Sequence, residues 1–213
     1  METKSHILLI SYPVQGHVNP MLQFSKRLAS KGARVTFVIT STIANSMQAH
    51  VTRSVNIEII SDGSEDVKDL ESLDEYLKRF KLSVSESLAK LIERLNNSKH
   101  PPRILVYDSL SPFFTQACVV NAIYYHAHQG AIQMPLEGSS ISLPSMPSLE
   151  INDLPSFLYD TGSYPAILNV VVDQFSNFQD ANCFLCNSFD KLEYEVGSTI
   201  YTNRTRFSQF HFK

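Results

Sequence analysis

The stretch ILLISYPVQGHVNP, residues 7–20, decides the fold of this 213-residue chain. It starts with an apolar run typical of a buried strand and turns at Gly16. Asn19 and Pro20 then favour the start of a helix, as N-cap and first helical residue. Ligands of open α/β sheets bind beyond the carboxyl ends of the strands, so His17 is expected at a place suited to chemistry.

The residues that follow alternate between strand and helix patterns, which predicts an α/β fold with a Rossmann-like parallel sheet and flanking helices. An apolar stripe from Leu70 to Leu95 recurs at three- and four-residue steps. It is short for a coiled coil and lies between two strand candidates, which favours a crossover helix. The expected strands are 7–11, 35–39, 55–60, 104–107 and 181–187, and the other expected helices are 20–31, 43–49, 114–130 and 164–178, with a Pro- and Ser-rich loop over 134–155.

Asp108 repeats the placement of His17, because it also follows a short apolar strand. If the two strands are neighbours in a parallel sheet, the two side chains meet at one edge. A neutral imidazole can accept a proton, as a general base must. The simpler alternatives are a turn histidine bonded to the backbone and an aspartate that caps the segment 109–113.

Composition excludes several classes of function. The net charge of −3, the pI near 6.1 and the scattered Lys and Arg residues argue against binding of nucleic acid. No apolar run approaches the ~18 residues of a membrane span, and the polar segment 1–6 is no signal peptide, so we expect a cytoplasmic protein. Three cysteines cannot form a disulfide framework, and Cys183 and Cys186 are interpreted as part of a buried strand rather than as metal ligands. His126 and His128 are two residues apart, a poor spacing for a metal pair on a helix.

The sequence contains the motifs PVQGHVNPMLQF at 13–24, VYDS at 106–109, FFTQ at 113–116, LPSF at 154–157 and NSFDKLE at 187–193. These five motifs resemble the N-terminal, acceptor-binding domain of plant UDP-dependent glycosyltransferases, an inverting family with the two-domain GT-B fold. The resemblance implies that His17 is the general base and that Asp108 orients its ring. It implies that Thr115 contacts the donor sugar, that a UDP-sugar is the co-substrate, and that no metal or other cofactor is needed.

The chain departs from that family's pattern in two places. Only four residues join Asp108 to Phe113, where the family has a helix and a strand, which indicates an internal deletion near 109–113. The sequence also contains no Trp, the residue with which the family's donor-binding signature begins. We therefore expect an acceptor-binding domain over 1–196, an atypical tail over 197–213, and no C-terminal UDP-sugar-binding domain.

Two functions remain open at this point. The first is the acceptor-binding half of a UDP-glycosyltransferase, which glucosylates a hydroxyl or carboxylate of a small hydrophobic acceptor but binds UDP-sugar weakly and is inactive alone. Met134, Leu136 and Phe157 are candidates for its acceptor pocket by composition. The second is a non-catalytic module that binds a small molecule or a relative. A nucleotide-cofactor oxidoreductase is disfavoured, because Gly16 is not part of a G-x-G-x-x-G motif.

Overall fold

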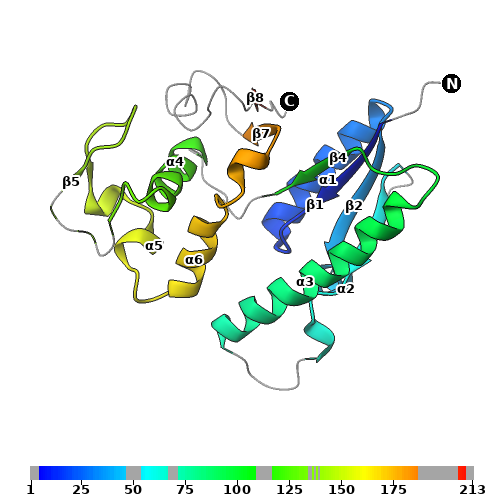
Figure 1. The fold of residues 1–213 in the computed structure, drawn as a ribbon, viewed down its shortest axis with the longest axis horizontal. Coiled ribbons are helices and arrows are strands. Elements are labelled where there is room, and N and C mark those ends of the chain that lie inside the picture. The colour runs from blue at the N-terminus through cyan, green and yellow to red at the C-terminus, as the bar shows by residue number, and fades with distance from the viewer. Residues whose placement is uncertain are drawn as a thin grey trace. The chain divides into compact units, whose positions relative to one another are not determined.

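The computed structural model describes residues 5–46, 54–66, 72–108, 117–133, 136, 138, 140–186 and 206–209. The chain divides into two compact units, Met1–Ser109 and Leu110–Lys213 (Figure 1). This boundary falls where the sequence indicates a deletion. The expectation of one domain over residues 1–196 stays a prediction, and each unit has a hydrophobic core of its own.

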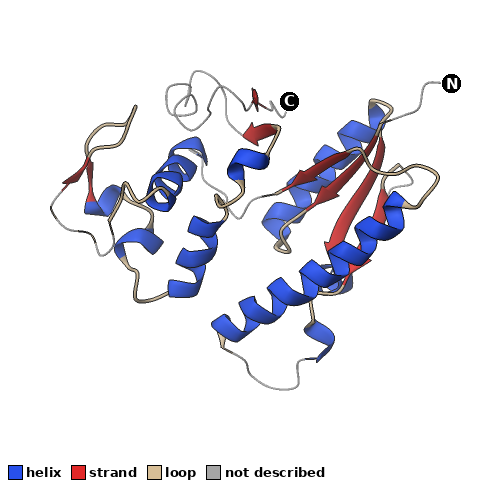
Figure 2. Cartoon of the chain, viewed as in Figure 1, coloured by secondary structure: helices blue, strands red, loops and turns tan. Residues whose placement is uncertain are grey.

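Unit 1 contains a parallel four-stranded sheet with the order β3-β2-β1-β4, which confirms the predicted α/β class. Leu8 at the centre of β1 lies opposite Thr36 on β2 and Leu105 on β4. Helices alternate with the strands along this unit (Figure 2). The strands are β1 (His6–Ile10), β2 (Arg34–Thr40), β3 (Asn56–Ile60) and β4 (Ile104–Tyr107), and the helices are α1 (Gln15–Ser30), α2 (Ser41–Ser46) and α3 (Leu73–Asn96).

The strand order places α1 and α3 on opposite faces of the sheet. From β1 to β2 the chain moves one way across the sheet, and from β3 to β4 it returns the other way. Crossovers between parallel strands are right-handed in nearly all proteins, and with that handedness the reversal puts the two helices on different faces. The reversal occurs between β1 and β4, and the carboxyl ends of these two strands precede His17 and Asp108. The site predicted from the sequence therefore lies at the switch point of the sheet.

Helix α3 is the predicted crossover helix, and its two halves differ in burial. It starts with a capping box, in which the Ser72 hydroxyl accepts from the Glu75 N–H and the Glu75 carboxylate accepts from the Ser72 N–H. In its last turns, Leu91 and Leu95 pack with Leu8 and other residues of the sheet in one buried cluster. Near its start the apolar stripe is only partly covered, and Leu73 is 42% exposed.

Helix α1 begins earlier than predicted. The Val14 carbonyl accepts hydrogen bonds from the N–H groups of His17 and Val18, at 2.8 and 3.0 Å, so the helix starts at Gln15 and not at Pro20. Pro20 lies inside the helix, where it removes the one bond that its N–H would make to the Gly16 carbonyl. The predicted start relied on Asn19 and Pro20 as N-cap and first helical residue. The N–H groups in the first turn of a helix have no partner within the helix in any case, so a helix can begin without a capping side chain, as α1 does at Gln15.

The described part of unit 2 contains three α-helices, which pack around a core that includes Ile123 of α4, Leu158 of α5 and Val171 of α6. The Pro- and Ser-rich segment is less irregular than predicted, because β5 and β6 form a small antiparallel ladder in it. Strand β8 pairs in parallel with β7, although it lies in the segment 197–213 that is predicted to be an atypical tail. The elements are α4 (Ala117–His128), β5 (Ser140–Ile141), β6 (Leu149–Glu150), α5 (Ser156–Tyr159), α6 (Pro165–Asp173), β7 (Cys183–Cys186) and β8 (Arg206–Gln209).

Within the described part of the chain, no helix combines the length and the apolar character needed to cross a membrane.

Candidate active site

His17 lies in the first turn of α1, a few residues beyond the carboxyl end of β1. Its backbone N–H is held by the Val14 carbonyl, which fixes the direction in which the side chain leaves the helix. The imidazole is nearly covered, with 7% of the side chain exposed. A ring in this position has little freedom, so its orientation depends on the few groups that contact it.

Asp108 follows β4 directly and lies at the same edge of the sheet. Its backbone N–H donates to the Ile10 carbonyl at 3.0 Å, which continues the parallel β1–β4 pairing by one residue. The expectation that the two strands are neighbours is therefore confirmed. The Asp108 side chain is 20% exposed and extends from the end of the sheet toward α1.

The two side chains meet. His17 Nδ1 lies 2.7 Å from Asp108 Oδ2, a short hydrogen bond between an imidazole and a carboxylate. A carboxylate can only accept, so Nδ1 carries the hydrogen and Nε2 is the nitrogen that takes up a proton. This arrangement orients an imidazole as a general base and provides a negative charge that stabilises the imidazolium once it forms. The catalytic roles of both residues stay predictions.

An aromatic ring also contacts the imidazole, which the sequence analysis did not predict. The centroid of the Tyr12 ring lies 5.6 Å from that of His17 with the planes at 63°, an edge-to-face contact. The centroid of the Tyr12 ring also lies 6.2 Å from that of Phe80 on α3. Burial, and to a smaller degree the nearby Tyr76, raises the pKa of Tyr12. The available signal was an aromatic residue two positions after the first strand.

Another carboxylate, Asp62, is buried at the carboxyl edge beyond β3. It accepts hydrogen bonds from the Ser41 hydroxyl at 2.9 Å and from the N–H groups of Thr42 and Ser64, each at 3.2 Å. Burial alone would raise the pKa of Asp62, but these hydrogen bonds outweigh it and hold the pKa well below its usual value. Asp62 thus joins the start of α2 to the loop after β3 and is a structural residue.

The remaining predicted site residues belong to unit 2 or are not described. Thr115 and Met134 lie outside the described residues. Leu136 and Phe157 are partly buried against the core of unit 2. Cys183 begins β7 but is exposed, so the burial predicted for this strand is wrong at its first residue. Among the residues whose structure is described, no group of three or more His, Cys, Asp or Glu side chains could hold a metal ion.

Comparison with known proteins gives a consistent result. The chain is 40% identical over 209 residues to mogroside I-E synthase from Siraitia grosvenorii, an alignment that covers 90% of this chain and 46% of that protein. It is 41% identical over 213 residues to UDP-glycosyltransferase 74E2 from Arabidopsis thaliana, with 91% of this chain and 47% of that protein covered. No family model matches the chain.

Solved structures show the same relationship. The crystal structure of Os79 from O. sativa in complex with UDP matches with a TM-score of 0.75 and 26% identity, over 94% of this chain and 50% of that one. Os79 in complex with U2F and trichothecene matches with a TM-score of 0.78. The Rossmann-like architecture expected of a GT-B half is thereby confirmed. The chain spans about half the length of the curated relatives it matches, and these relatives are plant UDP-glycosyltransferases.

Proposed function

We propose that this chain provides the acceptor-binding and proton-accepting part of a glycosyl transfer from a UDP-sugar to a small hydrophobic acceptor. The 2.7 Å contact between His17 Nδ1 and Asp108 Oδ2 carries the proposal, because it pairs an oriented imidazole with a carboxylate at the ligand-binding edge of the sheet. Two similar proteins support the proposal: one is named mogroside I-E synthase, and the other, Os79, was crystallised in complex with UDP.

In the proposed reaction, Nε2 of His17 takes the proton from the acceptor hydroxyl. The acceptor oxygen then forms a bond to the anomeric carbon, while the bond from that carbon to the diphosphate breaks on the opposite face and UDP leaves. The configuration at the anomeric carbon is inverted. The proton stays on His17, where the Asp108 carboxylate compensates its charge. Proton transfer to a positioned base contributes about 10²- to 10⁴-fold to such a rate.

Binding of the UDP-sugar donor is expected to require groups beyond His17 and Asp108. The 213 residues contain no Trp, and Thr115 remains the one proposed contact to the donor sugar. We therefore expect the chain by itself to bind UDP-glucose weakly in calorimetry. Transfer needs the donor held against the base at near-attack distance, so turnover is expected only when a donor-binding half is joined to the chain. Low-micromolar binding of UDP-glucose by the chain alone would contradict this part of the proposal.

The test compares two acceptors that differ in whether they need a base. At pH 7 a carboxylic acid is already ionised, whereas a phenol keeps its proton. The chain is joined to the donor-binding half of a relative and assayed with 4-methylphenol and 4-methylbenzoic acid. His17→Gln is expected to lower transfer to the phenol about 10²- to 10⁴-fold and transfer to the acid far less. His126→Gln, which changes a partly buried histidine of unit 2, is the control. Full transfer to the phenol by His17→Gln would refute the proposal.

One observation favours the second candidate function, a non-catalytic interaction module. Ile104, Leu105 and Tyr107 of the edge strand β4 are 46%, 52% and 49% exposed, although parallel strands are usually buried on both faces. Among the described residues, β4 pairs with β1 alone. A joined protein without transfer activity, together with association that Leu105→Lys abolishes in sedimentation velocity, would favour this function over catalysis.

A further inference from the structure

The sheet of unit 1 ends in two edge strands, β3 and β4, and the two strands differ in charge (Figure 1). Glu58 lies at the centre of β3, where its carboxylate accepts a hydrogen bond from Arg94 of α3 at 2.6 Å. Pairing of β3 with its own copy about this centre would bring two Glu58 carboxylates together. Strand β4 has the sequence ILVY and contains no charged residue. A charge in an edge strand opposes pairing with another strand, so β3 is protected and β4 is not.

The side chains of β4 are unusually exposed for a strand of a parallel sheet. Leu105 and Tyr107 on one face are 52% and 49% exposed, and Ile104 on the other face is 46% exposed. Within the described part of the chain, β4 pairs with β1 and with no other strand. The outer side of β4 therefore combines backbone donors and acceptors with apolar side chains on both faces, which is the combination that a further strand covers.

A second copy of this chain fits this edge by symmetry. Residues that lie opposite each other in an antiparallel pair point to the same face of the sheet, and a two-fold axis through Leu105 meets this condition along the whole strand. Each Leu105 then lies opposite the other. Ile104 lies opposite Val106 of the second copy, and the Arg103 guanidinium lies opposite the ring of Tyr107, a favourable pair of cation and aromatic ring.

The charges at the two ends of β4 favour the same arrangement. The loop between α3 and β4 contains Lys99 and Arg103 and no acidic residue. The other end of β4 is followed by Asp108, whose side chain is 20% exposed. Antiparallel pairing brings the positive amino end of each strand beside the negative carboxyl end of the other. Pro102 lies opposite Asp108 in this register and, because it has no N–H, ends the ladder there.

We propose that β4 is a homodimer interface, at which two copies of unit 1 join their sheets edge to edge by antiparallel pairing about Leu105. This inference goes beyond the proposed function and does not depend on it, because the pairing uses the β4 edge and not the imidazole of His17. The two candidate sites lie at opposite edges of the joined sheet, since antiparallel strands end in opposite directions.

Sedimentation velocity of the 213-residue chain over a range of concentrations tests the proposal. The original chain is expected to approach the mass of two chains as its concentration rises. Leu105→Lys opposes two like charges on the axis and removes buried apolar area from both copies, so it is expected to weaken dimerisation roughly 10-fold or more. Ile59→Lys is the matched control on the other edge strand, where Ile59 is 59% exposed, and it is expected to dimerise as the original chain does.

A mixing experiment tests the symmetry of the pairing. Leu105→Glu alone is expected to dimerise as weakly as Leu105→Lys, because it also opposes two like charges. An equimolar mixture of the two variants is expected to recover dimers, since an axis through Leu105 sets lysine opposite glutamate. This recovery also shows that both variants are folded. His17→Gln is expected to dimerise fully, which separates the interface from catalysis.

Three results would overturn the inference. The first is an original chain that stays monomeric, in which case another part of the chain or a different partner covers β4. The second is dimers that Leu105→Lys leaves intact or that Ile59→Lys disrupts equally. The third is a mixture of Leu105→Lys and Leu105→Glu that stays monomeric. Dimers that meet all three conditions, in a protein that shows no transfer when joined to a donor-binding half, would refute the proposed function and support the interface.

Discussion

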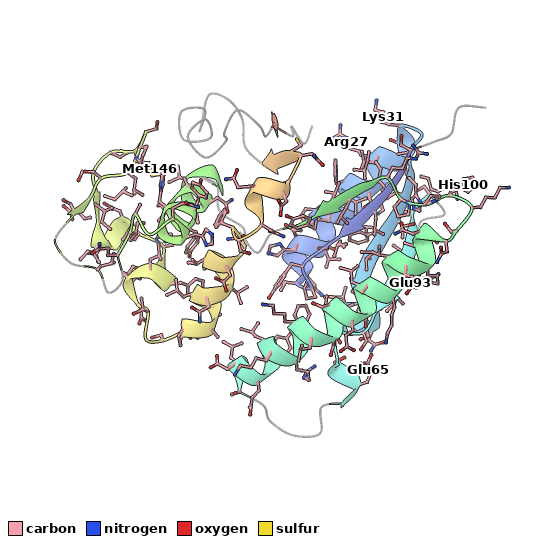
Figure 3. The ribbon with its side chains drawn as sticks, in the orientation of Figure 1. Arg27, Lys31, Glu65, Glu93, His100 and Met146 are labelled. Carbon is pink, nitrogen blue, oxygen red and sulfur yellow. The ribbon has the colours of Figure 1, made fainter. Side chains whose placement is uncertain are left out.

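One buried histidine begins strand β1 and another lies beyond its carboxyl end, in α1, and the two imidazoles have different partners. His6 begins the strand and is 5% exposed, whereas His17 follows it and is 8% exposed. The Nδ1 atom of His6 lies 2.6 Å from the His100 carbonyl, and its Nε2 lies 2.9 Å from the Thr36 hydroxyl. Figure 3 labels His100 in the loop beyond the C-terminal end of α3. The partner of His17 is the Asp108 carboxylate.

This difference separates a structural histidine from a candidate base. A carbonyl oxygen accepts but carries no full charge, so the hydrogen bonds of His6 provide no anion for an imidazolium. Burial lowers the pKa of His100 most, and the positive charges of Arg34 and Lys99 near that edge lower it further. At the carboxyl edge the imidazole meets a carboxylate instead. Burial and position relative to a strand do not distinguish the two histidines, whereas the charge of the partner does, and it is the charge that makes His17 the candidate base.

The largest expected effect is on catalysis. In the chain joined to a donor-binding half, Asp108→Asn is expected to lower kcat for a phenol about 10²- to 10⁴-fold. The amide has no charge to stabilise the imidazolium, and its NH₂ group can donate to Nδ1 and so favour the other tautomer. His6→Gln is expected to leave kcat unchanged per folded molecule. Steady-state kinetics test the comparison, and equal losses in the two variants would remove the distinction drawn between the two ends of β1.

The sequence predicts the carboxyl edge of the sheet better than the amino edge. The site pair was predictable because each residue follows an apolar strand, and parallel neighbours end at one edge. His6 was not predicted, since it belongs to a polar segment, 1–6, and nothing local shows that the chain buries it. Its partners are 30 and 94 residues away along the chain, so its role depends on tertiary packing alone.

The same limit applies to the aromatic residues near the site. The apolar stripe predicts that Phe80 faces the sheet, but the period of a helix does not show which end of the stripe lies over strands and which lies beside a ligand site. Tyr12 follows its strand as His17 does, yet its contact with Phe80 joins residues from distant parts of the chain. The start of α1 was predicted wrongly for the opposite reason, because a local signal at Pro20 was given too much weight.

A smaller effect is expected on stability at the amino edge. His6→Leu leaves the Thr36 hydroxyl, which is 2% exposed, and the His100 carbonyl without their partner. We expect the free energy of unfolding to fall by about 1–3 kcal/mol for this loss. The double variant His6→Leu with Thr36→Val is expected to recover part of the lost free energy of unfolding. Removing the imidazole and the hydroxyl together leaves fewer buried polar groups without a hydrogen-bond partner. Urea denaturation measures both changes, and a His6→Leu chain as stable as the original would contradict the structural role.

The smallest effect is expected on how stability depends on pH, at Asp62, the other carboxylate described at the carboxyl edge of the sheet. The hydrogen bonds from Ser41, Thr42 and Ser64 hold the pKa of Asp62 below its usual value in the folded chain. A carboxyl group with a lowered folded pKa stabilises the fold above its unfolded pKa of about 4, and this contribution is lost as the pH falls below that value. Asp62→Asn is therefore expected to be less stable than the original chain at pH 7, with a difference that narrows toward pH 3.

Glu75→Gln is the matched control for this pH dependence. Glu75 also has a lowered pKa, through its bonds to the backbone and side chain of Ser72, but it lies at an exposed helix start. Solvent screens such surface interactions, so its variant is expected to show a weaker dependence on pH than Asp62→Asn. Urea midpoints at pH 7, 5 and 3 give the comparison. If the Asp62→Asn difference stays constant over this range, the carboxylate is not held in its charged form by the start of α2. Asp62 would then be a packing residue, and Asp108 would be the one carboxylate at this edge whose charge matters.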